Sequence, residues 1–198
     1  MELTNIKYGN TNTYLIRGTK ANLLIDTDYA GTLPAFYKAI KNIGIKVSDI
    51  GYVMATHYHP DHIGLISELM EQGVKLVIVE SQVPFVHYSD YIFEREPDLN
   101  YKPIDESKAI ILAVSDARRF FENEIGADAE ILDMTSHGEG SIAVSLDHGN
   151  DIIVGDVEPL EYMDAYEKGT PYRNDWDRIL QRSPRRVYYS HMGSRVIR

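Results

Sequence analysis

The sequence contains no cysteine among its 198 residues. The chain can therefore form neither a disulfide framework nor a thiolate metal ligand, and any metal site must use His, Asp and Glu. Long apolar runs are absent too, since no segment has the length that a bilayer-spanning helix needs. These absences argue against a disulfide-stabilised protein and against a membrane-spanning one.

Positive charge is scarce. The chain has 20 Lys and Arg against 30 Asp and Glu, which gives a formal net charge of -10. This balance argues against a general affinity for nucleic acids or anionic membranes, although it does not exclude a small phosphate ester held by metal. The first residues, MELTNIKYGNTNTYLI, lack the basic and apolar regions of a signal peptide. We therefore expect a cytoplasmic protein.

What is present is an ordinary globular composition, with 43% hydrophobic and 25% charged residues. This length suits a single domain over residues 1–198. Strand-like runs and segments of helical spacing follow one another, which predicts an α/β layered domain with helices outside a sheet-rich core. We expect strands at 13–18, 22–28, 49–56, 75–80, 129–135, 141–156 (a hairpin turning at 147–150) and 185–191, and helices at 33–44, 63–73 and 115–126.

Residues 81–107 do not fit this pattern. They are rich in aromatic residues, carry three prolines and show no sustained period. Structureless segments of this length are uncommon inside a compact domain and often have a function. We expect a lid or long loop, with room for one helical piece.

The segment VMATHYHPDHIG, residues 53–64, concentrates titratable side chains. His57, His59, Asp61 and His62 fall within six positions directly after an apolar run. In an extended segment, residues two apart point to the same side, so His57 and His59 can reach one point. Pro60 is suited to opening a helix whose first turn aims Asp61 and His62 at a neighbouring point. Four such ligands at this spacing predict a site for zinc, iron or manganese.

Further ligand types follow other strand-like runs. His137, Asp156 and His191 each come directly after such a run, where side chains gather at one edge of a sheet. The remaining histidines differ, because His148 lies in the expected hairpin turn and His87 lies in segment 81–107. We expect His148 to be exposed, and His87 to have no role or a minor contact with substrate.

These residues carry a resemblance. THYHPDH, a later His before Gly-Ser, the Asp of VGD and a final Ser-His resemble the metallo-β-lactamase-fold hydrolase superfamily. The segments NTYLI and LLIDTD are similar to its first strands, and the match runs from Asn12 to His191. The resemblance implies a four-layer αβ/βα sandwich, with a glyoxalase II-like or lactonase-like core and two metals at one end of the facing sheets.

The resemblance also implies the role of each ligand. His57, His59 and His137 would bind the first metal, Asp61, His62 and His191 the second, and Asp156 would bridge the two. Asp26 would orient a ligand histidine by accepting its other N–H, or would simply be a turn residue at a strand end. One departure concerns the loop before His137, which reads Thr-Ser-His where many relatives have Thr-Pro-Gly-His.

The implied activity is that of a dinuclear metal-dependent hydrolase, in which a hydroxide bridging the two ions attacks a small ester, lactone, thioester or phosphodiester. Asp61 is the expected catalytic proton shuttle. The ions would be zinc, or else iron or manganese. Because only seven residues follow His191, we do not expect the C-terminal substrate domain of glyoxalase II. His59 stands where flavodiiron proteins carry a carboxylate, so we do not expect reduction of oxygen or NO. The alternative is a non-catalytic metal-dependent sensor on the same fold.

Aromatic residues could line a partly apolar substrate pocket, or they could belong to ordinary packing of two long loops over the core. Tyr58 would pack or steady an oxyanion. The expected partner is a small-molecule substrate, with no nucleic acid or membrane, and a homodimer is left open. The aromatic candidates are Phe85, Tyr88, Tyr91, Phe93 and Tyr101 in segment 81–107, with Tyr162, Tyr166 and Tyr172 after Asp156.

Overall fold

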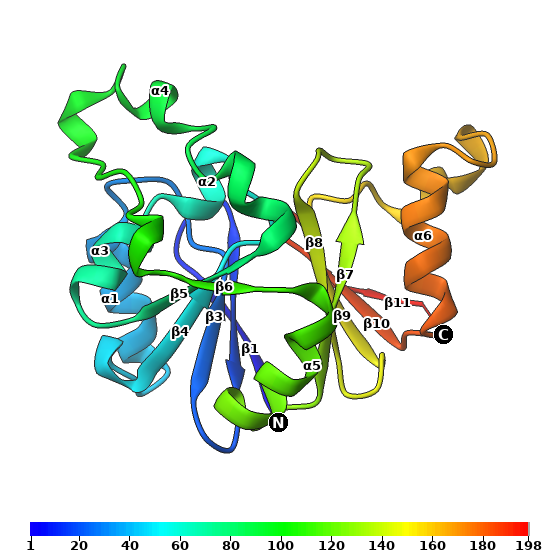
Figure 1. The fold of residues 1–198 in the computed structure, drawn as a ribbon, viewed down its shortest axis with the longest axis horizontal. Coiled ribbons are helices and arrows are strands. Elements are labelled where there is room, and N and C mark those ends of the chain that lie inside the picture. Colours follow the sequence, from blue (N-terminus) through cyan, green and yellow to red (C-terminus); the bar gives the residue numbers. More distant parts are fainter. Residues whose placement is uncertain (198) are drawn as a thin grey trace.

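The computed structural model describes residues 1–197, which form two facing sheets with helices on their outer sides (Figure 1). In the first sheet, β1 to β3 are antiparallel neighbours and β3 to β6 run parallel. Its strands lie in sequence order: β1 Glu2–Lys7, β2 Asn12–Arg17, β3 Asn22–Ile25, β4 Ile50–Met54, β5 Lys75–Val79 and β6 Ile110–Leu112.

The second sheet has the order β11-β10-β9-β8-β7. β9 and β10 are parallel, and the other neighbours are antiparallel. Its strands are β7 Ala129–Met134, β8 Ser141–Leu146, β9 Asp151–Gly155, β10 Arg186–Tyr189 and β11 Arg195–Val196.

Apolar residues follow one another along the strands, and successive side chains point to opposite faces, so each sheet buries both faces. In β2, Tyr14 and Ile16 pack between the sheets, whereas Leu15 packs under the outer helices. In β9, Ile153 faces the first sheet and Val154 faces the last helix. Helices α1 (Leu33–Asn42) and α3 (Ile66–Glu71) cover the first sheet, and α6 (Pro171–Gln181) covers the second. The predicted four-layer sandwich is therefore confirmed.

The two sheets are joined at the edge where the ligand-bearing loops lie. The Thr56 carbonyl accepts the Ile142 N–H at 2.8 Å, and the Ser190 carbonyl accepts the Asn12 N–H at 2.6 Å. The Tyr14 hydroxyl also donates to the Tyr189 carbonyl at 2.7 Å. Loops from both sheets thereby hold fixed positions relative to each other.

The expected helix over 63–73 is divided. Helix α2 (Pro60–Ile63) starts earlier, within the histidine motif, and α3 follows after a break. A Cβ at Gly64 would lie 2.2 Å from the Ala30 backbone nitrogen, so only glycine fits this approach of two loops. The expected helix over 115–126 is likewise built of short pieces: η5 Val114–Asp116, α5 Ala117–Phe120 and the π-helical η6 Phe121–Ile125.

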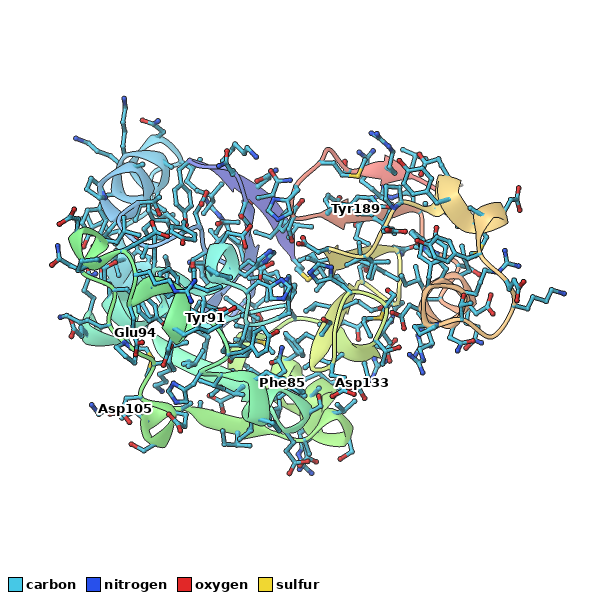
Figure 2. The ribbon with its side chains drawn as sticks, turned by 90° about the horizontal axis from the view of Figure 1, so that it is seen from above. Phe85, Tyr91, Glu94, Asp105, Asp133 and Tyr189 are labelled. Carbon is cyan, nitrogen blue, oxygen red and sulfur yellow. The ribbon has the colours of Figure 1, made fainter. Side chains whose placement is uncertain are left out.

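Segment 81–107 contains more regular structure than expected. It holds most of η2 (Glu80–Phe85) and of η4 (Glu106–Lys108), and all of α4 (Asp90–Phe93) and η3 (Pro97–Leu99), lying on the ligand-bearing side of the first sheet. Val86, Ser89 and Phe93 are buried, and Ser89 Oγ donates to the Tyr58 carbonyl at 2.6 Å. The segment therefore has a packed base beneath exposed side chains such as Tyr91 (Figure 2).

The sequence patterns did not predict the strands β1, β6 and β11 or the helix α6. The segment after Asp156 was interpreted as a long loop, but it forms η7 (Leu160–Ala165) and then α6. Thr170 caps α6 by accepting the Arg173 N–H, and Pro171 occupies its first position. These two signals mark the start of a helix. The remaining short helix is η1, Val47–Asp49.

Candidate metal centre

All seven candidate ligands lie on segments that follow the carboxyl ends of strands. The β4–α2 segment carries four of them, the β7–β8 loop carries His137, and Asp156 and His191 follow β9 and β10. The chain thus brings together side chains that are separated by as many as 134 positions (191 − 57). The predicted gathering at one edge of the sandwich is what the structure shows.

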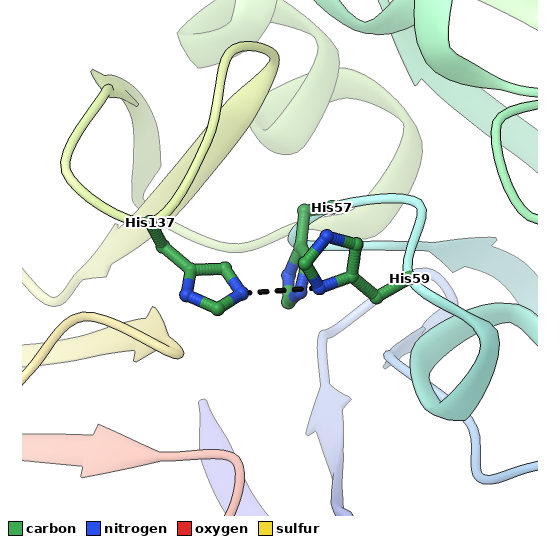
Figure 3. A group of neighbouring side chains, drawn as sticks. All are labelled: His57, His59 and His137. Carbon is green, nitrogen blue, oxygen red and sulfur yellow. Dashed lines mark hydrogen bonds between the residues drawn. The ribbon is translucent and has the colours of Figure 1, made fainter.

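The first group consists of His57, His59 and His137, whose ring nitrogens lie within 4.8 Å of one another. His137 Nε2 is 3.1 Å from His59 Nδ1, and the rings converge from opposite sides (Figure 3). The shorter loop before His137 therefore does not prevent it from reaching the motif. Its loop is held by Asp175, a fully buried residue whose Oδ2 accepts the N–H groups of Thr135 and Ser136 at 2.8 and 2.7 Å.

The second group consists of Asp61, His62 and His191, with one ligand atom each within the same 4.8 Å. His191 Nε2 lies 3.1 Å from Asp61 Oδ2, and His62 Nε2 lies 3.9 Å from Asp61 Oδ1. Asp61 stands in the first turn of α2, as the position of Pro60 predicted. The structure therefore assembles the two sets that the resemblance implied.

Asp156 lies between the two groups. Its Oδ2 atom is 3.9 Å from His57 Nε2 and 3.6 Å from His137 Nε2 in the first group. It is also 3.5 Å from His62 Nε2 and 3.3 Å from His191 Nε2 in the second. One carboxylate oxygen is thus within 4 Å of four imidazole nitrogens that belong to both sets.

Asp26 orients the motif from behind. Its Oδ2 is 3.0 Å from His62 Nδ1, and its Oδ1 accepts the Thr56 N–H at 2.6 Å. The hydroxyls of Thr56 and Ser190 also donate to Oδ2, at 2.9 and 3.2 Å. When Nδ1 of His62 carries the proton, Nε2 keeps its lone pair toward Asp156. Thr56 Oγ1 lies 3.1 Å from His57 Nδ1 and orients the His57 ring. The sequence analysis did not assign this role to Thr56.

The electrostatics of the site suit cations. Burial, with the neighbouring His62, holds the pKa of His57 well below its usual range. Burial also lowers the pKa of His59 and of His137. Burial would raise the pKa of the Asp156 carboxyl, but the hydrogen bond and charge of His62 keep it low. Neutral His57, His59 and His137 beside an ionised Asp156 have the protonation states that a metal requires. Burial would lower the pKa of His62, but the charges and hydrogen bonds of Asp26 and Asp156 outweigh burial and raise the pKa of His62 to about 10, so His62 must give up a proton when a metal binds.

Unpartnered atoms test whether this donor set fits a metal. Among residues 1–197, His57 Nε2, His62 Nε2 and Asp156 Oδ1 are buried without a hydrogen-bond partner. Buried polar atoms normally have partners, and these three belong to residues whose ligand atoms converge on one space. Imidazole and carboxylate are ligands that zinc, iron and manganese accept. The residues present therefore fit a pair of divalent transition-metal ions.

Two histidines lie apart from this site. His87 Nδ1 and Nε2 bond to Asp90 and Glu106 at 2.7 and 2.9 Å, so it connects two parts of segment 81–107. His148 is exposed in the β8–β9 turn and pairs with Asp128 at 2.7 Å. Its φ of 56° is part of that turn.

Two cavities open beside the ligands. The first, of about 230 Å³, is lined by the first histidine group with Tyr58, Phe85, Tyr88 and Glu139, among others. The second, of about 360 Å³, lies on the other side of His137 and reaches α6. Tyr58 is buried, whereas Tyr88 is exposed. Tyr162 is exposed and lines neither of these two cavities, so its expected substrate contact has no support from its position.

Of the other aromatic candidates, Phe93 and Tyr101 stack on each other at 3.8 Å and line neither of the two cavities beside the ligands. Tyr91 lies at the surface and lines neither of the two cavities. Tyr166 and Tyr172 do line the second cavity. The sequence analysis missed Ser136 and Glu158 as cavity residues, since neither belongs to the histidine motif.

Solved structures share this architecture. A metallo-beta-lactamase family protein from Thermus thermophilus is 21% identical, with a TM-score of 0.71 over 98% of this chain and 73% of that chain. The protein TTHA1623, described in a di-iron-bound form, is 19% identical, with a TM-score of 0.70 over 99% of this chain and 94% of that chain. At these identities the similarity shows the fold.

Among curated proteins, a lactamase-like protein of Arthroderma benhamiae is 29% identical over 112 residues, or 56% of this chain. The match spans only 22% of that relative's length. The family described as the metallo-beta-lactamase superfamily matches residues 6–191. This range covers both sheets except most of β1 and all of β11, and it includes all seven clustered ligands. The chain therefore belongs to the metallo-beta-lactamase superfamily.

Proposed function

We propose that this protein is a hydrolase that uses two divalent transition-metal ions, preferably zinc, to cleave a small ester, lactone, thioester or phosphodiester in the cytoplasm. The position of Asp156 carries the proposal. One of its oxygens lies within 4 Å of nitrogens from both three-residue groups, as a ligand shared by two ions would. Paired metal sites of this kind occur in hydrolases.

Each residue has a distinct task in this proposal. His57, His59 and His137 would hold one ion, Asp61, His62 and His191 the other, and Asp156 both. When bound, two such ions lower the pKa of water toward neutrality and polarise the bond to be cleaved. Asp26 and Thr56 fix the two buried imidazoles, so the ligand atoms keep their positions without reorganisation.

Asp61 is proposed to move the proton. Its side chain is 35% exposed, and its Oδ2 is also 3.5 Å from the Thr11 hydroxyl. A carboxylate that is both at the centre and partly open to solvent can take a proton from water and give it to the departing oxygen or sulfur. Water is added across the cleaved bond, so an ester or thioester gives an acid with an alcohol or thiol, a lactone gives a hydroxy acid, and a phosphodiester gives a phosphomonoester and an alcohol.

The composition of the described fold is compatible with the proposed compartment. Among the helices within residues 1–197, none combines the length and apolar character needed to cross a membrane. The proposed partner is a small molecule that enters from solvent through the two cavities beside His137.

The test combines metal analysis with turnover. Purified protein should contain about two transition-metal ions per chain, and a chelator should remove both the ions and the hydrolysis of lactones, thioesters and phosphodiesters. Asp61→Ala should lower kcat about a hundredfold or more. His87→Ala is the matched control, because His87 lies outside the metal centre and should leave kcat within about twofold.

Elemental analysis without bound metal, and without uptake of added zinc or manganese, would refute the proposal. Metal uptake without turnover of any substrate in the panel would instead favour the non-catalytic metal-dependent sensor. Equal losses in Asp61→Ala and His87→Ala would show that Asp61 does not carry the proton.

A further inference from the structure

The second cavity lies beside Asp156 and His137 and is lined by acidic and aromatic side chains. It extends from Asp156 to the start of α6 and has a volume of about 360 Å³. Its lining includes Glu158, Tyr166 and Tyr172, and contains no Lys or Arg. The first cavity is also lined without Lys or Arg. An anionic group in either cavity would therefore find no cationic side chain in the lining.

Glu158 is an exposed residue whose carboxylate has a hydrogen-bond partner but no counter-charge among residues 1–197. The Tyr166 hydroxyl donates to its Oε2, and its backbone carbonyl accepts Trp176 Nε1 at 3.0 Å. Within the described residues 1–197, no basic side chain lies within salt-bridge distance of Glu158, whereas Glu161 in the same segment pairs with Arg195. Glu139 lines the first cavity and receives no such hydrogen bond from any residue within 1–197. Of the two carboxylates, Glu158 is the one oriented by a neighbouring hydroxyl.

Aromatic rings accompany this carboxylate. Tyr166 and Tyr172 stack at 4.2 Å with an interplanar angle of 27°, and both line the cavity. Their segment, residues 157–172, contains four acidic residues and one basic residue, Lys168. Aromatic rings beside a carboxylate favour a weakly hydrated cation, and the surrounding negative potential attracts one.

A buried hydroxyl gives a second polar contact in the same wall. Ser136 Oγ is buried without a hydrogen-bond partner among the described residues, and Ser136 lines the cavity. Because this oxygen is closed to solvent, the Ser136 side chain would have to rotate toward the cavity before a donor group of a ligand could reach it. A purely apolar occupant would leave it unpaired, at a cost in free energy.

We propose that the cavity bounded by Asp156, Glu158 and Tyr166 binds a positively charged group of the substrate, so that the metal centre acts on an ester, lactone or thioester bearing an ammonium or guanidinium group. This inference rests on the proposed hydrolase function, because Asp156 and His137 belong to the centre and also wall the cavity. It disfavours phosphodiesters and carboxylate-bearing thioesters as substrates.

The first experiment measures binding without turnover. Choline and 3,3-dimethylbutan-1-ol have nearly the same shape and differ in charge. Calorimetric titration of the metal-loaded protein should show choline binding about tenfold more tightly, or more. The fluorescence of Trp176, the single tryptophan, provides a local signal because its indole contacts Glu158. Equal affinities for the two probes would overturn the inference.

Variants then assign the preference to Glu158. Glu158→Gln should bring the two affinities within about twofold, as the charge is lost but the shape is kept. Tyr166→Phe, which frees the carboxylate, should reduce the preference and serves if Glu158→Gln does not fold. Glu167→Gln is the matched control, since Glu167 lies in the same segment but does not line the cavity. A preference that survives in Glu158→Gln would overturn the assignment.

Turnover separates this inference from the proposed function. Choline acetate ester and 3,3-dimethylbutyl acetate should differ about tenfold in kcat/KM, in the same direction as binding. Hydrolysis of both without preference would refute the cation site and leave the hydrolase standing. A preference in binding without hydrolysis of either ester would support the cation site and count against the proposed hydrolase.

Discussion

Asp26 Oδ2 lies 3.0 Å from His62 Nδ1, and both side chains are fully buried. Asp26 adopts a φ of 59°, in the left-handed region that few residues other than glycine occupy. This conformation follows β3 directly and accompanies contacts of the same carboxylate with Thr56 and Ser190. One residue thus ties the β4–α2 segment to the loop after β10, and through them both halves of the centre.

Removing this carboxylate should weaken metal binding without removing a ligand. We expect Asp26→Ala to lower metal affinity about 10- to 100-fold, because His62 loses the acceptor that fixes its ring. Competition titration with a chromophoric chelator measures the change. Asp28→Asn is the control, since Asp28 lies in the same loop and bonds only to backbone N–H groups and no histidine. An unchanged affinity in Asp26→Ala would contradict this role.

Asp175 should matter for the first ligand group alone. Asp175→Ala would leave the N–H groups of Thr135 and Ser136 without their acceptor, which we expect to cost about 1–3 kcal/mol of unfolding free energy. His137 would then be less well placed, so one metal should be lost before the other. Denaturant unfolding and metal stoichiometry measure the two effects. Asp177→Asn, exposed on the same helix, should change neither.

His87 should make stability depend on pH. Hydrogen bonds to Asp90 and then Glu106 raise the pKa of His87. A raised folded-state pKa contributes stability that is fully present below the unfolded pKa of about 6.5 and is lost as pH rises through the folded pKa. His87→Gln should therefore reduce unfolding free energy at about pH 5.5 and have little effect at alkaline pH.

The size of the His87 effect is limited by solvent, because its side chain is 46% exposed. We expect less than about 1 kcal/mol. Urea unfolding of the wild type and His87→Gln across this pH range measures the difference. A larger effect at alkaline than at acidic pH would show that the pairs with Asp90 and Glu106 are not responsible.

Residues 84–103 should exchange amide hydrogens unevenly and slow down when a substrate analogue binds. Exposed Tyr88 and Tyr91 stand on a base of Val86, Ser89 and Phe93, so we expect slow exchange at the base and fast exchange above it. Tyr88 lines the first cavity, which gives an analogue a direct contact with this segment. Hydrogen exchange followed by mass spectrometry, with and without the analogue, measures both effects.

A deletion provides the functional counterpart of that measurement. Removing part of residues 94–100 should raise KM or broaden substrate choice while leaving both metals bound, since no ligand lies in that range.

In the exchange experiment, uniformly slow exchange across residues 84–103 of the free protein would show that the whole segment is a packed structural element.

Local patterns in the sequence predicted the clustering of the candidate ligands and the layered architecture. His57 and His59 share a side because an extended segment alternates, and Pro60 opens the turn that carries Asp61 and His62. Continuous apolar runs in β2, β4 and β9 indicate strands that are covered on both faces. These are local rules, so they can be applied without knowledge of distant residues.

The surroundings of those ligands depend on tertiary contacts. Asp175 and Glu158 carry no local signal, because a carboxylate's task depends on which loop packs against it. The division of α2 from α3 at Gly64 likewise depends on the approach of Ala30, more than thirty positions away. The position of Asp156 among four imidazole nitrogens results from the packing of the two sheets against each other. This contact joins residues far apart in the chain, so the periodicity of the sequence does not predict it.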